Sequence, residues 1–382
     1  EDVNNLIKNL NSLGVKIVKS KNCVDISGVG IGGLNPTTKK LDMGNSGTAT
    51  RLMLGTLCNQ NFEVKFVGDK SLSKRNMYEV IKLLRQMGAK INSKNNRLPI
   101  TIKGFNETIP ITYNQKIPSA QIKSAILFAS LNSPGLTTVI ENISTRNHTE
   151  ILLKKFGAKI QTKKYKKGKI IKIIGQKELK AKNILIAGDP SAAAIVGSAA
   201  LIIPNSEIKI KKVNINKTRI TFFKILKRMN ANIKISNKKK ISNEQIADIT
   251  FKSSNLKGIH LGKEKVAEMI DEIPIFSILA AFAKGSSSFI GGNELKNKES
   301  NRIKSLYEGL IACKIKVKKK NDGLKIVGNK NNVVGSAKIK TYYDHRIAMI
   351  FLIMGLTSEK GIIVDNVNCI KTSFPNFLSL MK

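Results

Sequence analysis

The sequence has no tryptophan, and it is poor in aromatic residues and in cysteine. Aromatic residues make up 5% of the chain, and there are four cysteines. The scarcity of aromatic rings argues against a surface on which the bases of a single-stranded nucleic acid would stack. The cysteines stand singly, without the paired spacing of a zinc site, at Cys23, Cys58, Cys313 and Cys369. We therefore expect reduced thiols in the core, no disulfide and no metal.

Acidic residues and arginine are also scarce. The chain has 66 Lys and Arg against 26 Asp and Glu, a formal net charge of +40, yet only nine of the cations are arginine. A strongly basic chain suggests a nucleic-acid partner, but lysine spread beside abundant Asn and Ile is the composition that an A- and T-rich coding sequence produces. Arginine is therefore the more informative cation, because its planar group binds carboxylate or phosphate as lysine does not. Five arginines fall in motif-like stretches: Arg51, Arg75, Arg146, Arg302 and Arg346.

Long apolar runs are missing too. The longest, Ala192–Ile203 and Ile347–Leu356, are shorter than the roughly 18 residues that a membrane-spanning helix needs. We expect them to be core helices. The chain has 382 residues and 41% hydrophobic content, which is enough for two domains with their own cores. It begins at Glu1 inside an amphipathic helical pattern, so we expect that a preceding segment, and with it any targeting signal, is absent.

A helix-ending pattern recurs along the chain. Each copy has Leu-x-x-(Met/Leu/Phe), then a residue suited to a left-handed helix end, then an apolar residue, Lys and Ile, which predicts a helix followed by a strand. The copies lie about 70 to 80 residues apart, which indicates duplicated supersecondary units. We place the helix-ending residues at Gly14, Gly88, Gly157, Asn230 and Ile311, with a sixth helix over Phe374–Met381.

Apolar helices form a second series with the same period. They are expected to open near Thr48, Gln121, Asp189, Asp271 and Arg346. Each unit then has one amphipathic and one buried helix, with short strands between them. Helices related by pseudo-symmetry aim their N-termini alike, and converging N-termini attract an anion. We therefore expect two similar domains of three units each, with an anionic ligand held where the buried helices begin.

The stretch Asp271–Arg302 carries the clearest chemistry. An acidic pair opens a helix that has no polar face, so the helix should be buried and its first turn should lie at a site. Further on, Lys298, Glu299 and Arg302 lie within one turn, a grouping that suits binding an anion and moving a proton. On this stretch alone, a capped helix followed by a solvated charge run is the alternative interpretation.

Eight motifs stand in order over essentially the whole chain: LDMGNSGTATRLM (41–53), GDKSLSKRNM (68–77), SAQIKSA (119–125), TRNHTE (145–150), GDPS (188–191), MIDEIP (269–274), KESNR (298–302) and DHRIAM (344–349). Together they resemble the 3-phosphoshikimate 1-carboxyvinyltransferase (EPSP synthase) family of enolpyruvyl transferases. The resemblance implies a two-domain inside-out α/β fold of six βαβαββ-type repeats, the first of them truncated here. It places the N-termini of the buried helices at an interdomain cleft, between domains 1–187 and 188–382.

The resemblance also implies the reaction and its residues. The enolpyruvyl group of phosphoenolpyruvate would pass to the 5-hydroxyl of shikimate 3-phosphate, with release of phosphate, in the shikimate pathway to chorismate and the aromatic amino acids. Asp271 would take the hydroxyl proton and Glu299 would exchange a proton with the methylene carbon. Shikimate 3-phosphate would contact Ser119, Ala120, Gln121, Arg146, Asp271 and Lys298. Phosphoenolpyruvate would contact Gly47, Arg75, Gln121, Arg302 and Arg346. No cofactor is implied.

Several positions depart from the family's pattern. The first motif, a Gly-Asp-Lys-Ser-Ile-Ser-His-Arg-like loop, is absent, so we expect little activity from the chain as given. Asn76 replaces the usual Pro, and Asn147 replaces the usual Asp. Asn301 also replaces the usual Asp, and this last departure bears on the orientation of Arg302. Lys371 lies one position from the usual phosphoenolpyruvate-binding lysine and receives no role.

Two other functions share part of this pattern. A UDP-N-acetylglucosamine enolpyruvyl transferase would have a loop cysteine shortly before the arginine that matches Arg75, but residues 68–74 contain none. An RNA-terminus cyclase-like enzyme would explain the repeats and the charge, but it would need a nucleotidylated histidine and stacking rings. We therefore expect small anionic substrates, no nucleic-acid or membrane partner, a cytoplasmic monomer and sensitivity to glyphosate.

Overall fold

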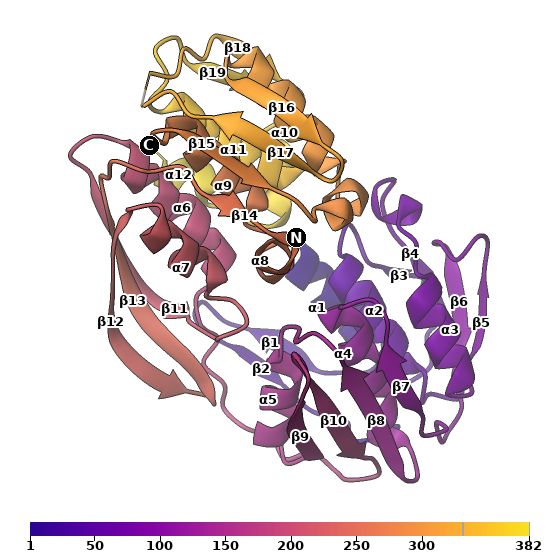
Figure 1. Cartoon of the computed structure of the whole chain (residues 1–382). Coiled ribbons are helices and arrows are strands. Elements are labelled where there is room, and N and C mark those ends of the chain that lie inside the picture. The colour runs from indigo at the N-terminus through magenta and orange to yellow at the C-terminus, as the bar shows by residue number, and fades with distance from the viewer. Residues whose placement is uncertain (331, 382) are drawn as a thin grey trace. The chain divides into compact units, whose positions relative to one another are not determined.

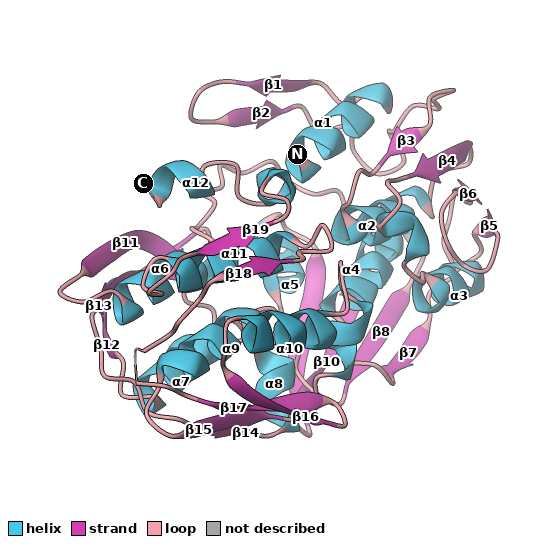
Figure 2. Ribbon diagram, turned by 90° about the horizontal axis from the view of Figure 1, so that it is seen from above, coloured by secondary structure: helices cyan, strands magenta, loops and turns pink. Residues whose placement is uncertain are grey.

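The computed structural model describes residues 1–330 and 332–381. The chain forms two compact units, Glu1–Ile184 and Leu185–Lys382, which Figure 1 draws from indigo to magenta and from magenta to yellow. Each unit has its own cluster of buried apolar side chains. In each, short strands alternate with helices, as the colouring of Figure 2 shows.

The first unit contains two four-stranded sheets, ordered β3-β4-β6-β5 and β7-β8-β10-β9, and a β1-β2 hairpin. Its elements are α1 (Asp2–Ser12), β1 (Ile17–Lys19), β2 (Val24–Ile26), β3 (Leu41–Asp42), α2 (Gly47–Leu57), β4 (Glu63–Val67), α3 (Tyr78–Gln86), β5 (Lys90–Ser93), β6 (Ile100–Lys103), β7 (Thr112–Gln115), α4 (Ala120–Ala129), β8 (Leu136–Glu141), α5 (His148–Lys155), β9 (Lys159–Tyr165) and β10 (Gly168–Ile174).

The second unit contains sheets ordered β11-β13-β12, β14-β15-β17-β16 and β18-β19. Its elements are α6 (Pro190–Ile202), β11 (Glu207–Asn214), α7 (Thr221–Arg228), β12 (Asn232–Ile241), β13 (Glu244–Lys252), β14 (His260–Leu261), α8 (Lys263–Glu268), α9 (Ile273–Phe282), β15 (Ser286–Phe289), α10 (Arg302–Ala312), β16 (Lys316–Lys320), β17 (Gly323–Val327), β18 (Ala337–Ile339), α11 (His345–Gly355), β19 (Ile362–Val364) and α12 (Phe377–Leu380).

One order of elements, β-α-β-α-β-β, repeats through both units. Two runs lie in the first unit, from β3 to β6 and from β7 to β10, and one in the second, from β14 to β17, with α8 as an additional helix. In these three runs the first two strands pair in parallel and the last two pair antiparallel. A further run, from α6 to β13, opens with a parallel bridge at Gly188 in place of a strand. The remaining elements, α1-β1-β2 and β18-α11-β19-α12, are parts of the same order, which confirms the predicted repeat fold.

The buried helices follow the predicted series. Every residue of α9 is buried, and its Ser277 hydroxyl donates to the Ile273 carbonyl at 2.9 Å, which satisfies a polar group in an apolar setting. Helices α2 and α4 pack closely enough that a Cβ built on Gly55 would lie 2.2 Å from the Ala125 carbonyl oxygen. Glycine at position 55 therefore lets the two helix backbones touch, and a side chain there would force them apart.

The predicted helix ends are correct at four positions and wrong at the fifth. Gly14, Gly88, Gly157 and Asn230 all have left-handed φ, between 65° and 103°. At the fifth end, Ile311 lies inside α10, and Lys314 takes the left-handed conformation with φ 64°. The sixth helix is also shorter than predicted, because a 3₁₀ turn at Asn368–Thr372 precedes an α12 that spans only Phe377–Leu380.

Cysteine and membrane predictions can also be compared with the structure. Cys58, Cys313 and Cys369 are buried, and burial raises the pKa of the first to about 12 and of the other two to about 11. Cys23 is exposed, so the prediction of a core thiol was wrong there. Among the described residues no helix is long and apolar enough to cross a bilayer. Over the same residues, no group of three or more His, Cys, Asp or Glu side chains is arranged to hold a metal ion.

Candidate active site

In the first unit, the N-termini of α2 and α4 lie together. The Gln121 Nε2 of α4 donates to the Thr48 Oγ1 of α2 at 2.6 Å. Each helix has a serine at its N-cap, where the Ser46 hydroxyl accepts from Ala49 N and the Ser119 hydroxyl from Ile122 N. Two helix N-termini side by side present partial positive charge to the same place. The convergence predicted from the repeats is therefore observed here.

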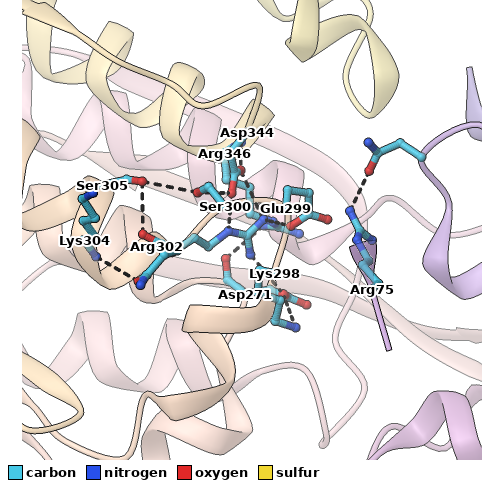
Figure 3. A network of polar contacts seen from close by, with 12 residues as sticks. Arg75, Asp271, Lys298, Glu299, Ser300, Arg302, Lys304, Ser305, Asp344 and Arg346 are labelled. Carbon is cyan, nitrogen blue, oxygen red and sulfur yellow. Dashed lines mark hydrogen bonds and ion pairs between the residues drawn. The ribbon is translucent and has the colours of Figure 1, made fainter. Parts of the chain in front are cut away.

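Arg75 is held by the loop that precedes α2. Its Nη2 donates to Asn45 Oδ1 at 2.6 Å, a bond drawn in Figure 3. Asn45 Nδ2 in turn donates to Asp69 Oδ2 at 2.5 Å, and the other oxygen of Asp69 accepts from Leu72 N at 2.7 Å. The motifs at 41–53 and 68–77 are thus joined through one amide and one carboxylate, which fix the guanidinium beside the start of α2.

A second arginine, Arg51, lies next to Arg75. Its guanidinium donates to the Gly47 carbonyl at 3.0 Å and to the Asn76 carbonyl at 3.2 Å. Burial, and then repulsion by Arg75, lower the pKa of Arg51 to about 10. Like charges brought together in a partly desolvated place favour the binding of an anion, because the anion relieves their repulsion. Arg51 thus stabilises the backbone at Gly47 and Asn76 through its hydrogen bonds, and it adds positive potential beside Arg75.

Gly47 is the first residue of α2 and lies against both arginines. A Cβ built there would lie 3.0 Å from Arg51 Nη1, 3.0 Å from Arg75 Nη1 and 3.7 Å from a methyl group of Leu72. The missing side chain therefore allows the two guanidinium groups to approach the helix start. Four residues of this unit are predicted to bind shikimate 3-phosphate. At the start of α4 lie Ser119, Ala120 and Gln121, and in the loop before α5 lies Arg146.

In the second unit, the N-termini of α6, α9 and α11 converge in the same way. The Ser191 hydroxyl in the first turn of α6 donates to Glu272, the N-cap of α9. Arg346 in the first turn of α11 donates from Nη1 to the Asp271 carbonyl at 3.0 Å. Asp189 caps α6 through its carboxylate, followed by Pro190 as predicted. These three helix starts therefore surround Asp271.

Arg302, the first residue of α10, is the centre of this cluster (Figure 3). Its Nε lies 2.8 Å from Asp344 Oδ2, and its Nη2 lies 2.6 Å from Glu299 Oε2. Its Nη1 lies 3.6 Å from Asp271 Oδ1, and Lys298 Nζ lies 3.4 Å from the same oxygen. Residues predicted separately to bind substrate or to move protons are thus brought into one ion cluster.

The three carboxylates differ in their access to solvent. The Asp344 side chain is 0% exposed, whereas those of Asp271 and Glu299 are 15% and 19% exposed. Arg302 itself is 1% exposed. Asp344 therefore acts as a permanent counter-ion beneath Arg302, while the other two carboxylates remain open to a ligand.

Electrostatics within the cluster follow from this packing. Burial would raise the pKa of Asp344, but the charge and the hydrogen bonds of Arg302 outweigh it and lower that pKa to about 2. For Arg302 burial acts to lower the pKa, and the charges of Asp344 and Glu299 raise it above its ordinary value instead. Burial and the neighbouring Arg346 lower the pKa of His345 to about 4, so this imidazole is neutral near pH 7.

Asn301 holds the start of α10. Its Oδ1 accepts from Lys304 N at 3.1 Å, so the amide acts as the N-cap of that helix. An aspartate would satisfy the same backbone group. Arg302 is oriented by its own carboxylate partners, and the departure at position 301 leaves that orientation intact.

Sequence reasoning did not single out every member of these clusters. In the sequence Asp344 is only one letter of a motif, yet it accepts from Arg302, from Ser300 Oγ at 3.0 Å and from Arg346 N at 2.9 Å. Asn45 likewise has no predicted role, although it holds Arg75. The available signal was position. Asn45 stands just before α2, which begins at Gly47, and Asp344 stands just before α11, which has Arg346 in its first turn.

The fold and the cations gathered at the starts of buried helices are those of an α/β protein suited to binding small anions. The family model for EPSP synthase (3-phosphoshikimate 1-carboxyvinyltransferase) matches residues 1–381. The chain belongs to the EPSP synthase family.

Individual relatives agree with this membership. The chain is 41% identical over 385 residues to the 3-phosphoshikimate 1-carboxyvinyltransferase of Parvibaculum lavamentivorans, covering 100% of this chain and 85% of that protein. It is 42% identical to the enzyme of the same name from Zymomonas mobilis, covering 100% of this chain and 86% of that protein. The solved EPSP synthase of Acinetobacter baumannii superposes with a TM-score of 0.85 at 37% identity, over 98% of this chain and 85% of that one. The family and its relatives favour this transferase over the UDP-N-acetylglucosamine and RNA-terminus alternatives.

Proposed function

We propose that the two clusters bind the substrates of the family's reaction and that Asp271 and Glu299 move its protons. The reaction transfers the enolpyruvyl group of phosphoenolpyruvate to the 5-hydroxyl of shikimate 3-phosphate and releases phosphate. Asp271 accepts the hydroxyl proton as the new C–O bond forms. Glu299 gives a proton to the methylene carbon of phosphoenolpyruvate and takes one back when the tetrahedral intermediate expels phosphate. The hydroxyl proton held by Asp271 leaves with that phosphate, so that the protons balance over the cycle.

The observation that carries this proposal is the difference in exposure among the three carboxylates on Arg302. A group that exchanges a proton with substrate must reach it, and only Asp271 and Glu299 of the three are partly exposed. Both lie close to the same guanidinium, which is itself 1% exposed and supplies positive charge beside the two carboxylates. The buried Asp344 keeps that guanidinium in place whether or not substrate is bound.

The remaining binding roles follow the positions of cations and helix starts. Gly47, Arg75, Gln121, Arg302 and Arg346 are proposed for phosphoenolpyruvate. Ser119, Ala120, Gln121, Arg146, Asp271 and Lys298 are proposed for shikimate 3-phosphate. Two multiply charged anions need bidentate donors and helix N-termini, and the described clusters supply both. We propose residues 1–187 as the N-terminal enolpyruvyl transferase domain and residues 188–382 as the C-terminal one.

The proposed setting is that of a cytoplasmic monomer with small anionic substrates. Its charge is carried mainly by lysine spread over the chain, and the described surface offers few aromatic rings for base stacking. We therefore propose no nucleic-acid partner. Adding RNA to the assay below should leave the rate unchanged at constant ionic strength.

A direct assay tests the proposed reaction. In a version of the chain that also carries the family's first motif, which is used for all kinetic measurements, phosphate release from phosphoenolpyruvate is followed with shikimate 3-phosphate, with UDP-N-acetylglucosamine, or with neither. We expect release only with shikimate 3-phosphate, together with a product that contains the enolpyruvyl group. Release that depends on the nucleotide sugar, or that needs no acceptor, would contradict the proposal.

A further inference from the structure

The first unit contains a completely buried ammonium group outside the Arg302 cluster. Lys123 of α4 is 0% exposed, and its Nζ lies 3.0 Å from Glu141 Oε1 and 2.8 Å from Glu150 Oε1. Both carboxylates are nearly fully buried as well. A buried ion pair adds little net stability, because desolvation offsets most of the attraction. Its three charged groups do, however, fix the relative positions of α4, β8 and α5, the elements that carry them.

The two carboxylates lie on either side of one loop. Glu141 is the last residue of β8, and Glu150 lies in the first turn of α5. The loop of residues 142–147 between them contains Arg146, a proposed contact of shikimate 3-phosphate. The Thr145 hydroxyl donates to the same Glu141 oxygen that faces Lys123. One ammonium group thus holds both ends of the loop, and the residue next to Arg146 is bonded to one of its partners.

Lys123 also lies in the second segment that is proposed to bind shikimate 3-phosphate, the start of α4. Lys123 lies in the first turn of α4, two residues after Gln121, and the Lys123 backbone N–H donates to the Ser119 carbonyl at 3.2 Å. The start of α4 and the Arg146 loop both belong to the run from β7 to β10, with β8 between them, and the Lys123 cluster joins them.

We propose that Lys123, Glu141 and Glu150 are positioning residues for shikimate 3-phosphate, which set Arg146 relative to the start of α4. This inference rests on the proposed function of Arg146. Charge-assisted hydrogen bonds are short and directional, and they hold a loop more tightly than apolar packing would. A misplacement of about 1 Å can cost about a hundredfold in an enzyme's efficiency, so such a device would act on substrate use more than on stability.

Thr145→Val is the sharpest test. It keeps the shape of the side chain and removes only the hydroxyl that donates to Glu141. We expect the Kd and the KM for shikimate 3-phosphate to rise about tenfold, the factor that corresponds to one charge-assisted hydrogen bond. The KM for phosphoenolpyruvate and the urea midpoint should stay close to wild type. Thr137→Val is the matched control, because Thr137 lies on the same strand, β8, is fully buried, and its hydroxyl has no hydrogen-bond partner.

Glu150→Gln provides a second, independent arm. The amide keeps the volume and an oxygen that can accept from Lys123, whereas Lys123→Met would leave two buried carboxylates without their cation and endanger folding. The same pattern is expected from Glu150→Gln: a higher KM for shikimate 3-phosphate, with the KM for phosphoenolpyruvate unchanged. A change in the urea midpoint alone, with both KM values unchanged, would overturn the inference.

Arg146→Lys separates a failure of the inference from a failure of the proposed function. If this change leaves the affinity for shikimate 3-phosphate intact, the proposed substrate contact is wrong and the inference falls with it. If Arg146→Lys weakens binding but Thr145→Val and Glu150→Gln behave like the Thr137→Val control, only the inference is overturned. In the Arg146→Lys background, Thr145→Val should change the affinity less than about twofold, because positioning acts through Arg146. A full tenfold effect there would point to a structural role and refute the proposal.

Discussion

Asp344→Asn tests whether one buried carboxylate organises the Arg302 cluster. The Asp344 carboxylate accepts from Arg302 Nε at 2.8 Å, from Arg302 Nη2 at 3.3 Å, from Ser300 Oγ at 3.0 Å and from Arg346 N at 2.9 Å. Asparagine has the same shape but only one accepting oxygen. Its NH₂ group would face at least one of these donors, so the substitution removes a charge and adds a donor-to-donor contact.

The expected cost follows from the burial of both partners. Removing one member of a buried ion pair costs about 3–5 kcal/mol, because the other charge is left in a place that water cannot reach. Glu299 and Asp271 still contact Arg302 after the change, at 2.6 and 3.6 Å. We therefore expect the low end, a loss of about 3 kcal/mol in the free energy of unfolding at pH 7.

The pH dependence of this loss gives a second magnitude. The pKa of Asp344 is about 2 in the folded protein, against 3.8 for an unperturbed aspartate. A lowered carboxylate pKa stabilises the fold above the unfolded pKa, and that contribution disappears as the pH falls towards the folded pKa. It amounts to about 2 kcal/mol, of which about 1 kcal/mol is lost by pH 3. Because Asp344→Asn lacks this titration, the difference between wild type and variant should shrink by about 1 kcal/mol between pH 6 and pH 3.

Urea unfolding at pH 6 and at pH 3 measures both quantities. Asp322→Asn is the control, since it makes the same chemical change at a partly exposed turn of the same unit and should alter stability by less than about 0.5 kcal/mol. A difference below about 1 kcal/mol at pH 6, or one that does not change down to pH 3, would refute Asp344 as the principal counter-ion of Arg302.

Three further predictions concern single positions in the two clusters. Asp271→Asn and Glu299→Gln should each lower kcat by about 10²- to 10⁴-fold while shikimate 3-phosphate still binds; turnover within a few-fold of wild type would remove the proposed proton-transfer roles. Gly47→Ala would place a methyl carbon 3.0 Å from Arg75 Nη1, and overpacking of about 1–3 kcal/mol should raise the inhibition constant for glyphosate more than the KM for phosphoenolpyruvate; equal shifts would show that Gly47 does not line that pocket. Asn301→Ala should cost about 1 kcal/mol in urea unfolding through loss of the α10 cap, whereas Asn301→Asp should cost nothing; equal stabilities of the two variants would contradict the capping role.

Much of the fold was predictable because its signals are local in sequence. Gly14, Gly88 and Gly157 mark helix ends through a conformation that other residues adopt at a cost, and the wholly apolar segment of α9 could only be buried. The fifth helix end lacked such a signal. Lys314 adopts the left-handed conformation although it is neither glycine nor asparagine. The apolar pattern alone fits more than one position for the helix end, and the prediction therefore placed that end at Ile311.

The ion clusters were less predictable, because their members are far apart in the chain. Lys123 is 27 residues from Glu150, and Arg302 is 42 residues from Asp344. In a chain this rich in lysine, a buried ammonium looks like any solvated one, and nothing local separates Lys123 from its neighbours. Its burial depends on residues distant in the sequence, Glu141 at the end of β8 and Glu150 in α5, and their meeting with Lys123 is a property of the fold.

The Lys123 and Arg302 clusters differ in the solvent exposure of their carboxylates, and this difference suits them to different roles. At Lys123 both carboxylates are shielded from solvent, so neither can exchange a proton with a ligand, and the cluster can only hold elements together. At Arg302 one carboxylate is shielded and two are open. The shielded Asp344 keeps the guanidinium paired even when Glu299 or Asp271 takes up a proton, so either of them can become neutral without leaving a buried cation uncompensated. The proton transfers proposed for Asp271 and Glu299 therefore depend on the constant charge of Asp344, and a test of Asp344 is also a test of that proposal.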